Sequence, residues 1–314
     1  MLQSLAISRF APICAIVVLL ITATRSAAAE ELRVMTFNLW QGGEEGRQPL
    51  AQTIRVIEAA KADVVGLQET AGLERDRKRP DNARRIAEQL GWAYLDQGQG
   101  TGVISRHKID KHTPEKLGVQ VGLPSGKKVW LFNVHFAHAP YQPYQLLKIP
   151  YADAPFIATA EQAVIEARKA RKRQVTALLD EIKKVRDEKA TAFITGDFNE
   201  PSVLDWTEPV FRARGCPLAV PWPTTATVRD AGFADAYRQI HPDPVQLPGY
   251  TWTPITAEND PKDRHDRIDF VFVDGDVKVT AVEVVGERAD RSDIVVKPYP
   301  SDHRAVVATV TWDN

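Results

Sequence analysis

The sequence lacks the features of a disulfide-stabilised, repetitive or strongly charged protein. It contains two cysteines in 314 residues, Cys14 and Cys216, and it shows neither an internal repeat nor a low-complexity linker. Its formal net charge is −1, which excludes a general electrostatic attraction to nucleic acid or to an anionic membrane. Because 44% of its residues are hydrophobic, we expect one large domain with a sizeable core.

The first 29 residues differ from the rest of the chain. Arg9 precedes the apolar run "APICAIVVLLITA", and the small residues of "TRSAAAEE" follow it, a layout typical of a secretory signal peptide cleaved near Ala29. The run is shorter than the roughly 20 residues that a membrane-spanning helix needs, although an uncleaved anchor is the alternative. We therefore expect a signal peptide over 1–29, a catalytic domain over 30–314, and a secreted or periplasmic monomer without a stable membrane anchor.

Cleavage would change the composition in two ways. The Lys+Arg count falls from 40 to 38 against 41 Asp+Glu, a net charge of about −3. Cys216 becomes the single cysteine, so the mature protein has no internal disulfide and depends on its core for stability. Any binding of phosphate must then be local.

Apolar runs with strand character alternate with helical patterns. Strands are predicted at 32–40, 63–70, 100–106, 127–136, 191–199, 267–275 and 303–312. Helical spacing is found over 50–62 and, as a strongly amphipathic stretch, over 160–189. This order indicates a mixed α/β or α+β protein.

Polar side chains with the chemistry of a metal or catalytic site cluster at the ends of these strands. They are Asn38, Glu69, His135, Asp197, Asn199, Asp269, Asp302 and His303. Carboxylates and carboxamides are hard oxygen ligands that suit Mg²⁺ or Mn²⁺, and no cysteine pattern for zinc is present. Glu69 and Asp302 could hold a magnesium ion that takes its other ligands from water and a phosphate.

Six segments in order resemble the motifs of the endonuclease/exonuclease/phosphatase superfamily. They are "TFNLW", "VVGLQET", "NVHF", "GDFN", "RIDFVFV" and "SDH", and the match runs from about residue 32 to 312. "GDFNEPSVLDWT" is further similar to an exported bacterial branch. The resemblance implies an α+β fold, a four-layered α/β/β/α sandwich of two mostly antiparallel sheets packed face to face, and metal-dependent hydrolysis of a phosphoester.

The resemblance also implies a role for each strand-end residue. The metal-side residues are Glu69, Asp302 and Asn38, and the catalytic residues are Asp197, Asn199, His303, Asp269 and His135. Asp197 would accept the proton of the attacking water, and Asn199 would donate to the water or to a phosphoryl oxygen. Asp269 would orient His303, and His135 would lie near the leaving group. The alternatives are turn, capping and exposed strand-end roles.

The implied function is an exported Mg²⁺- or Mn²⁺-dependent phosphoesterase that hydrolyses phosphodiester or phosphomonoester bonds by in-line attack of water. One alternative is a secreted nuclease acting on DNA or RNA. A second, of a different class, is an inactive binding module that retains the fold. All six motifs are intact, which favours an enzyme.

Two segments are individual to this chain. The segment 137–156 contains Tyr141, Tyr144, Tyr151 and Phe156, which could stack on a base or sugar, line an acyl groove, or pack as a lid over the core. The run "RKARKRQ" at 168–174 carries five cations, and we expect a solvated helix face there.

Overall fold

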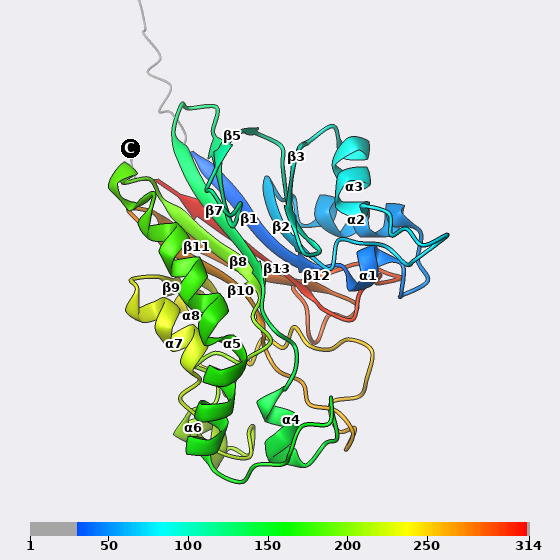
Figure 1. Ribbon diagram of the computed structural model, residues 1–314, viewed down its shortest axis with the longest axis vertical. Helices are drawn as coiled ribbons and strands as arrows, with labels where there is room; N and C mark the ends of the chain where they lie inside the picture. Colours follow the sequence, from blue (N-terminus) through cyan, green and yellow to red (C-terminus); the bar gives the residue numbers. More distant parts are fainter. Residues whose placement is uncertain (1–29, 313–314) are drawn as a thin grey trace, which may run out of the picture.

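Two β-sheets pack face to face in a computed structural model that describes residues 30–312 (Figure 1). The seven-stranded sheet has the order β12-β11-β13-β1-β2-β4-β3. Its strands are β1 (Glu31–Asn38), β2 (Val64–Gln68), β3 (Ala93–Gly98), β4 (Thr101–Ser105), β11 (Lys278–Gly286), β12 (Ile294–Val295) and β13 (Ala305–Thr311). The six-stranded sheet has the order β5-β6-β7-β8-β10-β9. Its strands are β5 (Lys108–His112), β6 (Gly118–Gly122), β7 (Lys128–His135), β8 (Ala192–Asp197), β9 (Ala234–Asp235) and β10 (Asp269–Asp274).

Most neighbouring strands are antiparallel. The exceptions are β1 with β2, β7 with β8, and β11 with the short β12. In the centre of the molecule, β1 also pairs antiparallel with β13, and β8 pairs antiparallel with β10. The predicted sandwich of two mostly antiparallel sheets is therefore confirmed.

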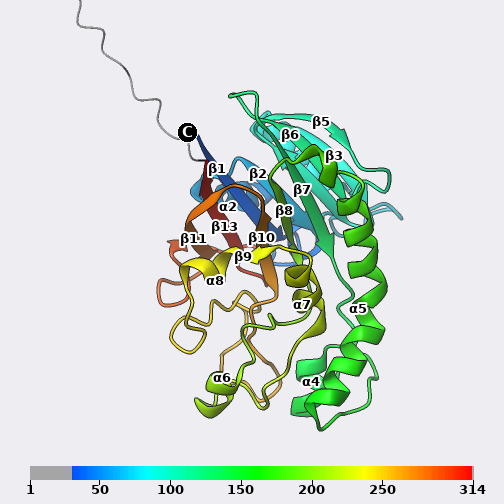
Figure 2. The same cartoon turned by 90° about the vertical axis from the view of Figure 1, so that its left-hand side faces the viewer.

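Helices cover the outer faces of both sheets, which gives four layers (Figures 1 and 2). The helices are α1 (Trp40–Gly43), α2 (Leu50–Ala59), α3 (Asn82–Leu90), α4 (Gln142–Leu147), α5 (Ala160–Lys183), the 3₁₀ turn η1 (Arg186–Glu188), α6 (Glu208–Arg212), α7 (Pro223–Asp230) and α8 (Ala236–Ile240). Helices α2 and α3 pack on the seven-stranded sheet, and α5 and α7 pack on the six-stranded sheet. The expected signal peptide lies outside the described residues. Within residues 30–312 no helix has both the length and the apolar character to span a membrane.

Alternating side chains on the central strands explain this layering. In β1, Val34 packs between the two sheets, whereas Met35 and Phe37 pack beneath α2 and α3. In β8, Phe193 points to the inter-sheet core and Ile194 points to α5. Because successive side chains of a strand point to opposite faces, each central strand buries both of its faces and reads as a continuous apolar run.

The inter-sheet core changes from apolar to polar toward one end of the strands. There Gln68 Nε2 donates to Asn133 Oδ1 at 2.6 Å, and Thr195 Oγ1 donates to the same oxygen at 3.2 Å. Gly66 permits this close approach, since a Cβ atom at that position would lie 2.1 Å from Thr195 Oγ1. The buried hydrogen bonds hold the two sheets in one register at the edge where the candidate site lies.

Candidate active site

The strand-end residues predicted from the sequence meet at one edge of the sandwich. Asn38, His135 and Asp197 end β1, β7 and β8, and Glu69 follows β2 directly. Asp269 begins β10, and His303 lies two residues before β13. Because β10 and β13 run antiparallel to β8 and β1, their first residues meet the last residues of those strands.

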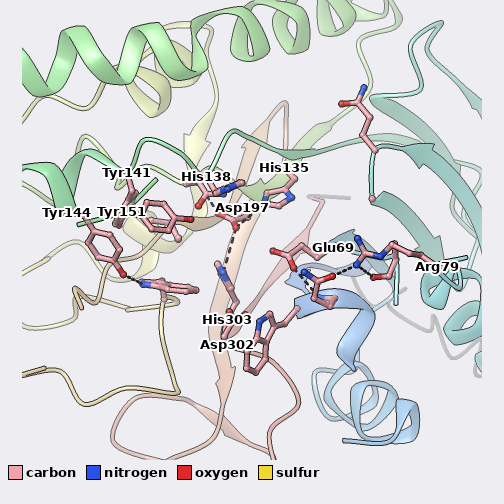
Figure 3. Close-up of a pocket in the computed structure, with 18 residues that line it drawn as sticks. Glu69, Arg79, His135, His138, Tyr141, Tyr144, Tyr151, Asp197, Asp302 and His303 are labelled. Carbon is pink, nitrogen blue, oxygen red and sulfur yellow. Dashed lines mark hydrogen bonds and ion pairs between the residues drawn. The ribbon is translucent and has the colours of Figure 1, made fainter. Parts of the chain in front are cut away.

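A cavity of about 490 Å³ opens at this edge (Figure 3). Its lining includes six of the predicted site residues: Glu69, His135, Asp197, Asn199, Asp302 and His303. Asn38 and Asp269 lie just beneath, at 0% and 1% exposure, in contact with lining residues. All eight predicted residues are thus brought together. A volume of this size suits a small organic ligand.

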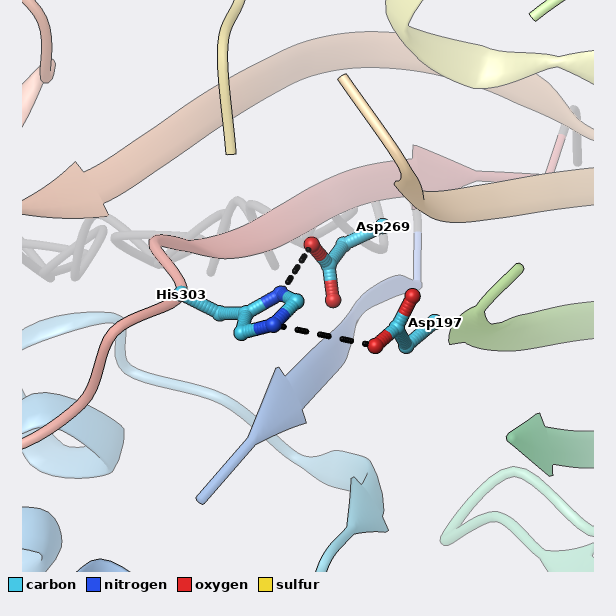
Figure 4. Close-up of side chains that lie close together, drawn as sticks. All are labelled: Asp197, Asp269 and His303. Carbon is cyan, nitrogen blue, oxygen red and sulfur yellow. Dashed lines mark hydrogen bonds and ion pairs between the residues drawn. The ribbon is translucent and has the colours of Figure 1, made fainter. Parts of the chain in front are cut away.

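His303 and Asp269 form a buried hydrogen-bonded pair (Figure 4). His303 Nδ1 lies 2.9 Å from Asp269 Oδ2, and the opposite ring nitrogen, Nε2, lies 3.7 Å from Asp197 Oδ2. Although burial disfavours the charged ring, the carboxylates of Asp269, Asp197 and Asp302 raise the pKa of His303 well above its ordinary value. These carboxylates therefore favour the charged form of the ring, and its Nε2 faces Asp197.

Asp197 is surrounded by hydrogen-bond donors. Its Oδ2 accepts from Asn38 Nδ2 at 3.0 Å and lies 3.5 Å from His135 Nε2, and its Oδ1 accepts from the backbone N–H of Asn199 at 2.9 Å. Asn199 has a φ of 49°, a left-handed conformation that asparagine tolerates better than most residues. The tight turn after β8 explains why an acid and an amide stand two positions apart.

The amide of Asn199 and the ring of His135 take up different positions around this carboxylate. Asn199 Nδ2 donates to the carbonyl of Phe136 at 3.1 Å, which occupies one of its two N–H groups. His135 is partly exposed on the cavity wall. Both residues therefore reach the cavity from the ends of the neighbouring strands β7 and β8.

Glu69 is held by the loop that follows β1. Its Oε1 accepts from Asn38 Nδ2 at 3.3 Å, and its Oε2 accepts from the backbone N–H of Gln41 at 3.1 Å. The Oδ1 atom of Asn38 in turn accepts from the backbone N–H of Trp40 at 3.0 Å. Asn38 thus bridges Glu69 and Asp197 and keeps the two carboxylates close together.

Asp302 is a buried carboxylate that forms no ion pair within residues 30–312, although the charge of His303 lies nearby. It is 7% exposed, and its Oδ1 has no hydrogen-bond partner among the described residues. Burial, with the nearby charges of Glu69 and Asp197, raises the pKa of its carboxyl group to about 7. An orphaned carboxylate oxygen beside Glu69 is the donor set that a hard divalent cation prefers, so these residues fit such an ion.

A second grouping also has the spacing of a metal site. One atom each of Asp197, Asp269 and His303 lie within 4.8 Å of one another. A ligating histidine must be neutral, however, and the hydrogen bond to Asp269 together with the raised pKa favours a charged ring. The geometry of His303 therefore favours an acid–base and phosphate-binding pair.

The tyrosines of the segment 137–156 form one wall of the cavity. Tyr141 and Tyr144 are buried, and their hydroxyls donate to Asp266 at 2.8 Å and to Asp263 at 2.5 Å. Tyr151 is 39% exposed and also lines the cavity. Part of the segment thus packs down, as the lid alternative expects, and part of it faces the cavity. Phe156, at 51% exposure, is not among the lining residues.

The expectation of a fully solvated cationic run at 168–174 is wrong at one position. Arg171 is 0% exposed and donates to Gln142 Oε1 at 2.6 Å and to the carbonyl of Pro140 at 3.1 Å. It also lies 3.7 Å from Glu200, which follows the Asp197–Asn199 turn. Arg171 therefore ties α5 to both the tyrosine segment and the Asp197–Asn199 turn, whereas Lys172 and Arg173 are exposed as expected.

Several residues in the cavity lining or directly behind it were not foreseen from the sequence. Ser301 Oγ donates to the carbonyl of Asn38 at 2.7 Å, and the Trp252 ring lies 4.9 Å from the His303 ring between centroids. Arg79 and Gln41 also line the cavity. Ser301 directly precedes Asp302 and could have been identified from its position, whereas loop residues such as Arg79 and Trp252 carry no periodic signal.

A model described as the Endonuclease/Exonuclease/phosphatase family matches residues 35–303, and the chain belongs to this family. The family includes phosphodiesterases, nucleases and phosphatases. An uncharacterized protein of Caenorhabditis elegans is 29% identical over 315 residues, which cover 92% of this chain and 94% of that protein.

Solved structures with the same fold share little sequence. An endonuclease/exonuclease/phosphatase from Bacteroides vulgatus matches with a TM-score of 0.57 at 17% identity, over 90% of this chain and 100% of that chain. Truncated TDP2 of Caenorhabditis elegans matches with a TM-score of 0.53 at 19% identity, over 90% of this chain and 97% of that chain. An AP endonuclease from Archaeoglobus fulgidus matches with a TM-score of 0.52 at 17% identity, over 90% of this chain and 100% of that chain.

Proposed function

We propose that the protein is an exported, Mg²⁺- or Mn²⁺-dependent phosphoesterase that hydrolyses a small phosphodiester or phosphomonoester. The observation that carries this proposal is the arrangement of charges around one cavity. The His303–Asp269 pair faces Asp197 on one side, and the carboxylates of Glu69 and Asp302 lie on the other. Phosphoryl transfer requires positioning and charge stabilisation, and this arrangement supplies both.

Asp197 acts as the general base. Hydrogen bonds from Asn38 and from the backbone N–H of Asn199 fix the orientation of its carboxylate, which accepts a proton from the attacking water. The water oxygen bonds to phosphorus as the ester bond to the leaving oxygen breaks. The charged His303 donates from Nε2 to a phosphoryl oxygen, Asn199 contributes a second donor, and we assign His135 to the leaving-group side.

Glu69 and Asp302, with Asn38 beside them, are the residues that would hold the divalent cation. The unpartnered Oδ1 atom of Asp302 supports this assignment. When bound, the cation neutralises charge on the phosphoryl oxygens. Gln41, through its backbone N–H, keeps the Glu69 carboxylate oriented.

The direct test is hydrolysis of bis(p-nitrophenyl) phosphate and p-nitrophenyl phosphate by the purified protein, with Mg²⁺, with Mn²⁺ and with chelator. We expect turnover that chelator abolishes and added metal restores. Absence of chelator-sensitive turnover on both esters, on DNA and on phospholipid would instead support the inactive binding module.

The main alternative substrate is nucleic acid. Within residues 30–312 the cavity lining contains one Lys or Arg, Arg79, against the carboxylates of Glu69, Asp197 and Asp302. A protein that tracks a polynucleotide needs several phosphate contacts, and its activity falls steeply with salt. We expect nearly flat salt dependence for a small diester. Polynucleotide cleavage that exceeds small-ester cleavage by orders of magnitude at physiological salt would favour the nuclease.

Export is proposed from the N-terminal sequence alone. The layout of residues 1–29 supports cleavage near Ala29 and a secreted or periplasmic monomer. Mass spectrometry of the mature N-terminus, with gel filtration of the same material, tests both statements. A mature chain that begins at Met1 or Leu2 would contradict the first.

A further inference from the structure

Arg79 is the one Lys or Arg side chain in the cavity lining, within the described part of the chain, and it faces a lining with three carboxylates. It comes from the loop between β2 and α3, and its side chain is exposed to solvent. A guanidinium presents several N–H donors in a planar fork that matches the oxygens of a phosphate or carboxylate.

Neutral acceptors orient this guanidinium. Arg79 Nε donates to the carbonyl of Gly72 at 2.8 Å, and Nη2 donates to the carbonyl of Ala71 at 3.0 Å and to the side chain of Gln41. Among residues 30–312, no carboxylate lies within ion-pair distance of it. Its full charge is therefore available to a ligand in the cavity.

Neighbouring arginines differ in this respect. Arg75 lies 2.9 Å from Glu44, Arg84 lies 3.5 Å from Asp81, and Arg85 lies 4.0 Å from Glu44. Each of these three is balanced by an acid on the protein surface. Arg79 is distinguished from them both by its place in the cavity lining and by its lack of an acidic partner.

Arg79 and the tyrosine wall lie on opposite sides of the reacting centre. Figure 3 shows Arg79 at one end, Tyr151 and Tyr144 at the other, and Asp197 and His303 between them. A substrate whose phosphoester lies against Asp197 can therefore extend one substituent toward the aromatic rings and the other toward the guanidinium.

We propose that Arg79 determines specificity by binding a second anionic group of a small phosphodiester, whose other substituent is a ring that packs on the tyrosine wall. This inference rests on the proposed function and narrows its substrate class. One oriented guanidinium suits a single additional phosphate or carboxylate, whereas a polynucleotide would require a row of cations.

The test compares two synthetic esters with the same scissile bond, namely thymidine 5′-(p-nitrophenyl phosphate) with and without a 3′-phosphate. We expect the wild-type protein to favour the ester with the extra phosphate by about 10-fold in kcat/KM, the effect of one charge-assisted contact at a partly exposed site. Arg79→Gln should reduce this ratio to about 1, and Arg79→Lys should retain part of it.

Arg77→Gln is the matched control, because Arg77 is exposed in the same loop and does not line the cavity. Its ratio should equal that of the wild-type protein. A wild-type ratio near 1, or an Arg79→Gln variant that loses activity equally on both esters, would overturn the assignment and indicate that Arg79 only braces its loop. Absence of metal-dependent turnover of either ester would instead overturn the proposed function, and the inference with it.

Discussion

Two buried clusters of charged residues lie close to each other in this fold, and they differ in how completely their charges are balanced. The first joins the loops beside α8 and β10, and its members are Asp205, Asp235, Arg238 and Arg267. The second is the candidate site, with Asp197, Asp269, Asp302 and His303. The two clusters are also close in the sequence, because a single residue separates Arg267 from Asp269.

In the first cluster every carboxylate oxygen has a donor. Arg267 donates to Asp205 at 2.9 and 3.0 Å and to Asp235 at 2.8 and 3.0 Å, and Arg238 donates to Asp205 at 2.8 Å. Two acids face two arginines, so the cluster is neutral. Such a network holds loops together and has no remaining capacity for a ligand.

In the second cluster the acids outnumber the cations. His303 is the single basic partner of Asp269, and Oδ1 of Asp269 and Oδ1 of Asp302 have no hydrogen-bond partner among the described residues. A buried charge without an opposite charge beside it destabilises the folded protein. Such a charge is typical of sites where a ligand supplies the missing opposite charge. The comparison shows that charge balance, rather than burial of charge, separates the candidate site from the first cluster.

The largest effect is expected from removing a reacting group. Asp197→Ala or His303→Ala should lower kcat by about 10²–10⁴-fold, because a general base and a charge-stabilising donor each contribute that much. Steady-state assays on bis(p-nitrophenyl) phosphate measure the loss, and circular dichroism checks the fold. A variant with near wild-type kcat would exclude the residue from the reaction.

A substitution in the first cluster should lower the free energy of unfolding of the protein. Arg267→Met leaves two buried carboxylates without their shared partner, and we expect it to lower the free energy of unfolding by about 3–5 kcal/mol. Denaturant titration measures this loss, and the exposed Lys172→Met is the control, with a change within about 0.5 kcal/mol. Equal stability of Arg267→Met and wild-type protein would show that the cluster is not structural.

Removal of a charge from the candidate site should raise the free energy of unfolding of the protein. The pKa of Asp302 is raised from 3.8 to about 7 in the folded protein, so its contribution to stability is present below pH 4 and is lost as the pH rises through 7. In chelator at pH 8, Asp302→Asn should therefore exceed wild-type stability by up to about 4 kcal/mol.

Denaturant titrations of both proteins between pH 4 and pH 8 measure this difference. It should shrink toward zero at the acid end, where the carboxyl group is protonated in the folded state and about half protonated in the unfolded state. Mg²⁺ should also reduce it at pH 8, by stabilising the wild-type protein. A difference that is constant across this pH range would contradict the assignment of an unbalanced carboxylate.

The smallest effect is expected at Glu69, the predicted metal-binding acid that follows β2. Glu69→Gln should raise the Mg²⁺ concentration for half-maximal activity by about 10- to 100-fold, since it removes one charged ligand. A metal titration measures the shift, with Glu74→Gln, an exposed acid of the following loop, as the control. A Glu69→Gln curve that superimposes on the wild-type curve would mean that the cation binds elsewhere.

Strands and site residues were predictable to different extents. The apolar runs around β1, β2, β7, β8, β10 and β13 have local patterns, and the predicted runs cover all of these strands. The edge strands β3, β5, β9 and β12 are short or partly exposed, and neither they nor their neighbours β6 and β11 were predicted. Propensity is weaker where tertiary packing supplies the stability of a strand.

The sequence alone determined that polar residues such as Asp197 and His303 stand at the ends of buried strands, because strand burial and turn chemistry are local properties of the chain. The tertiary structure decided which of those ends meet, since pairing partners lie far apart along the chain and only the packed sheets bring them to one edge. It also decided that Arg171 is buried while Lys172 beside it is exposed, and that Arg79 reaches the cavity. These outcomes depend on which surfaces other segments cover, and no local pattern encodes that information.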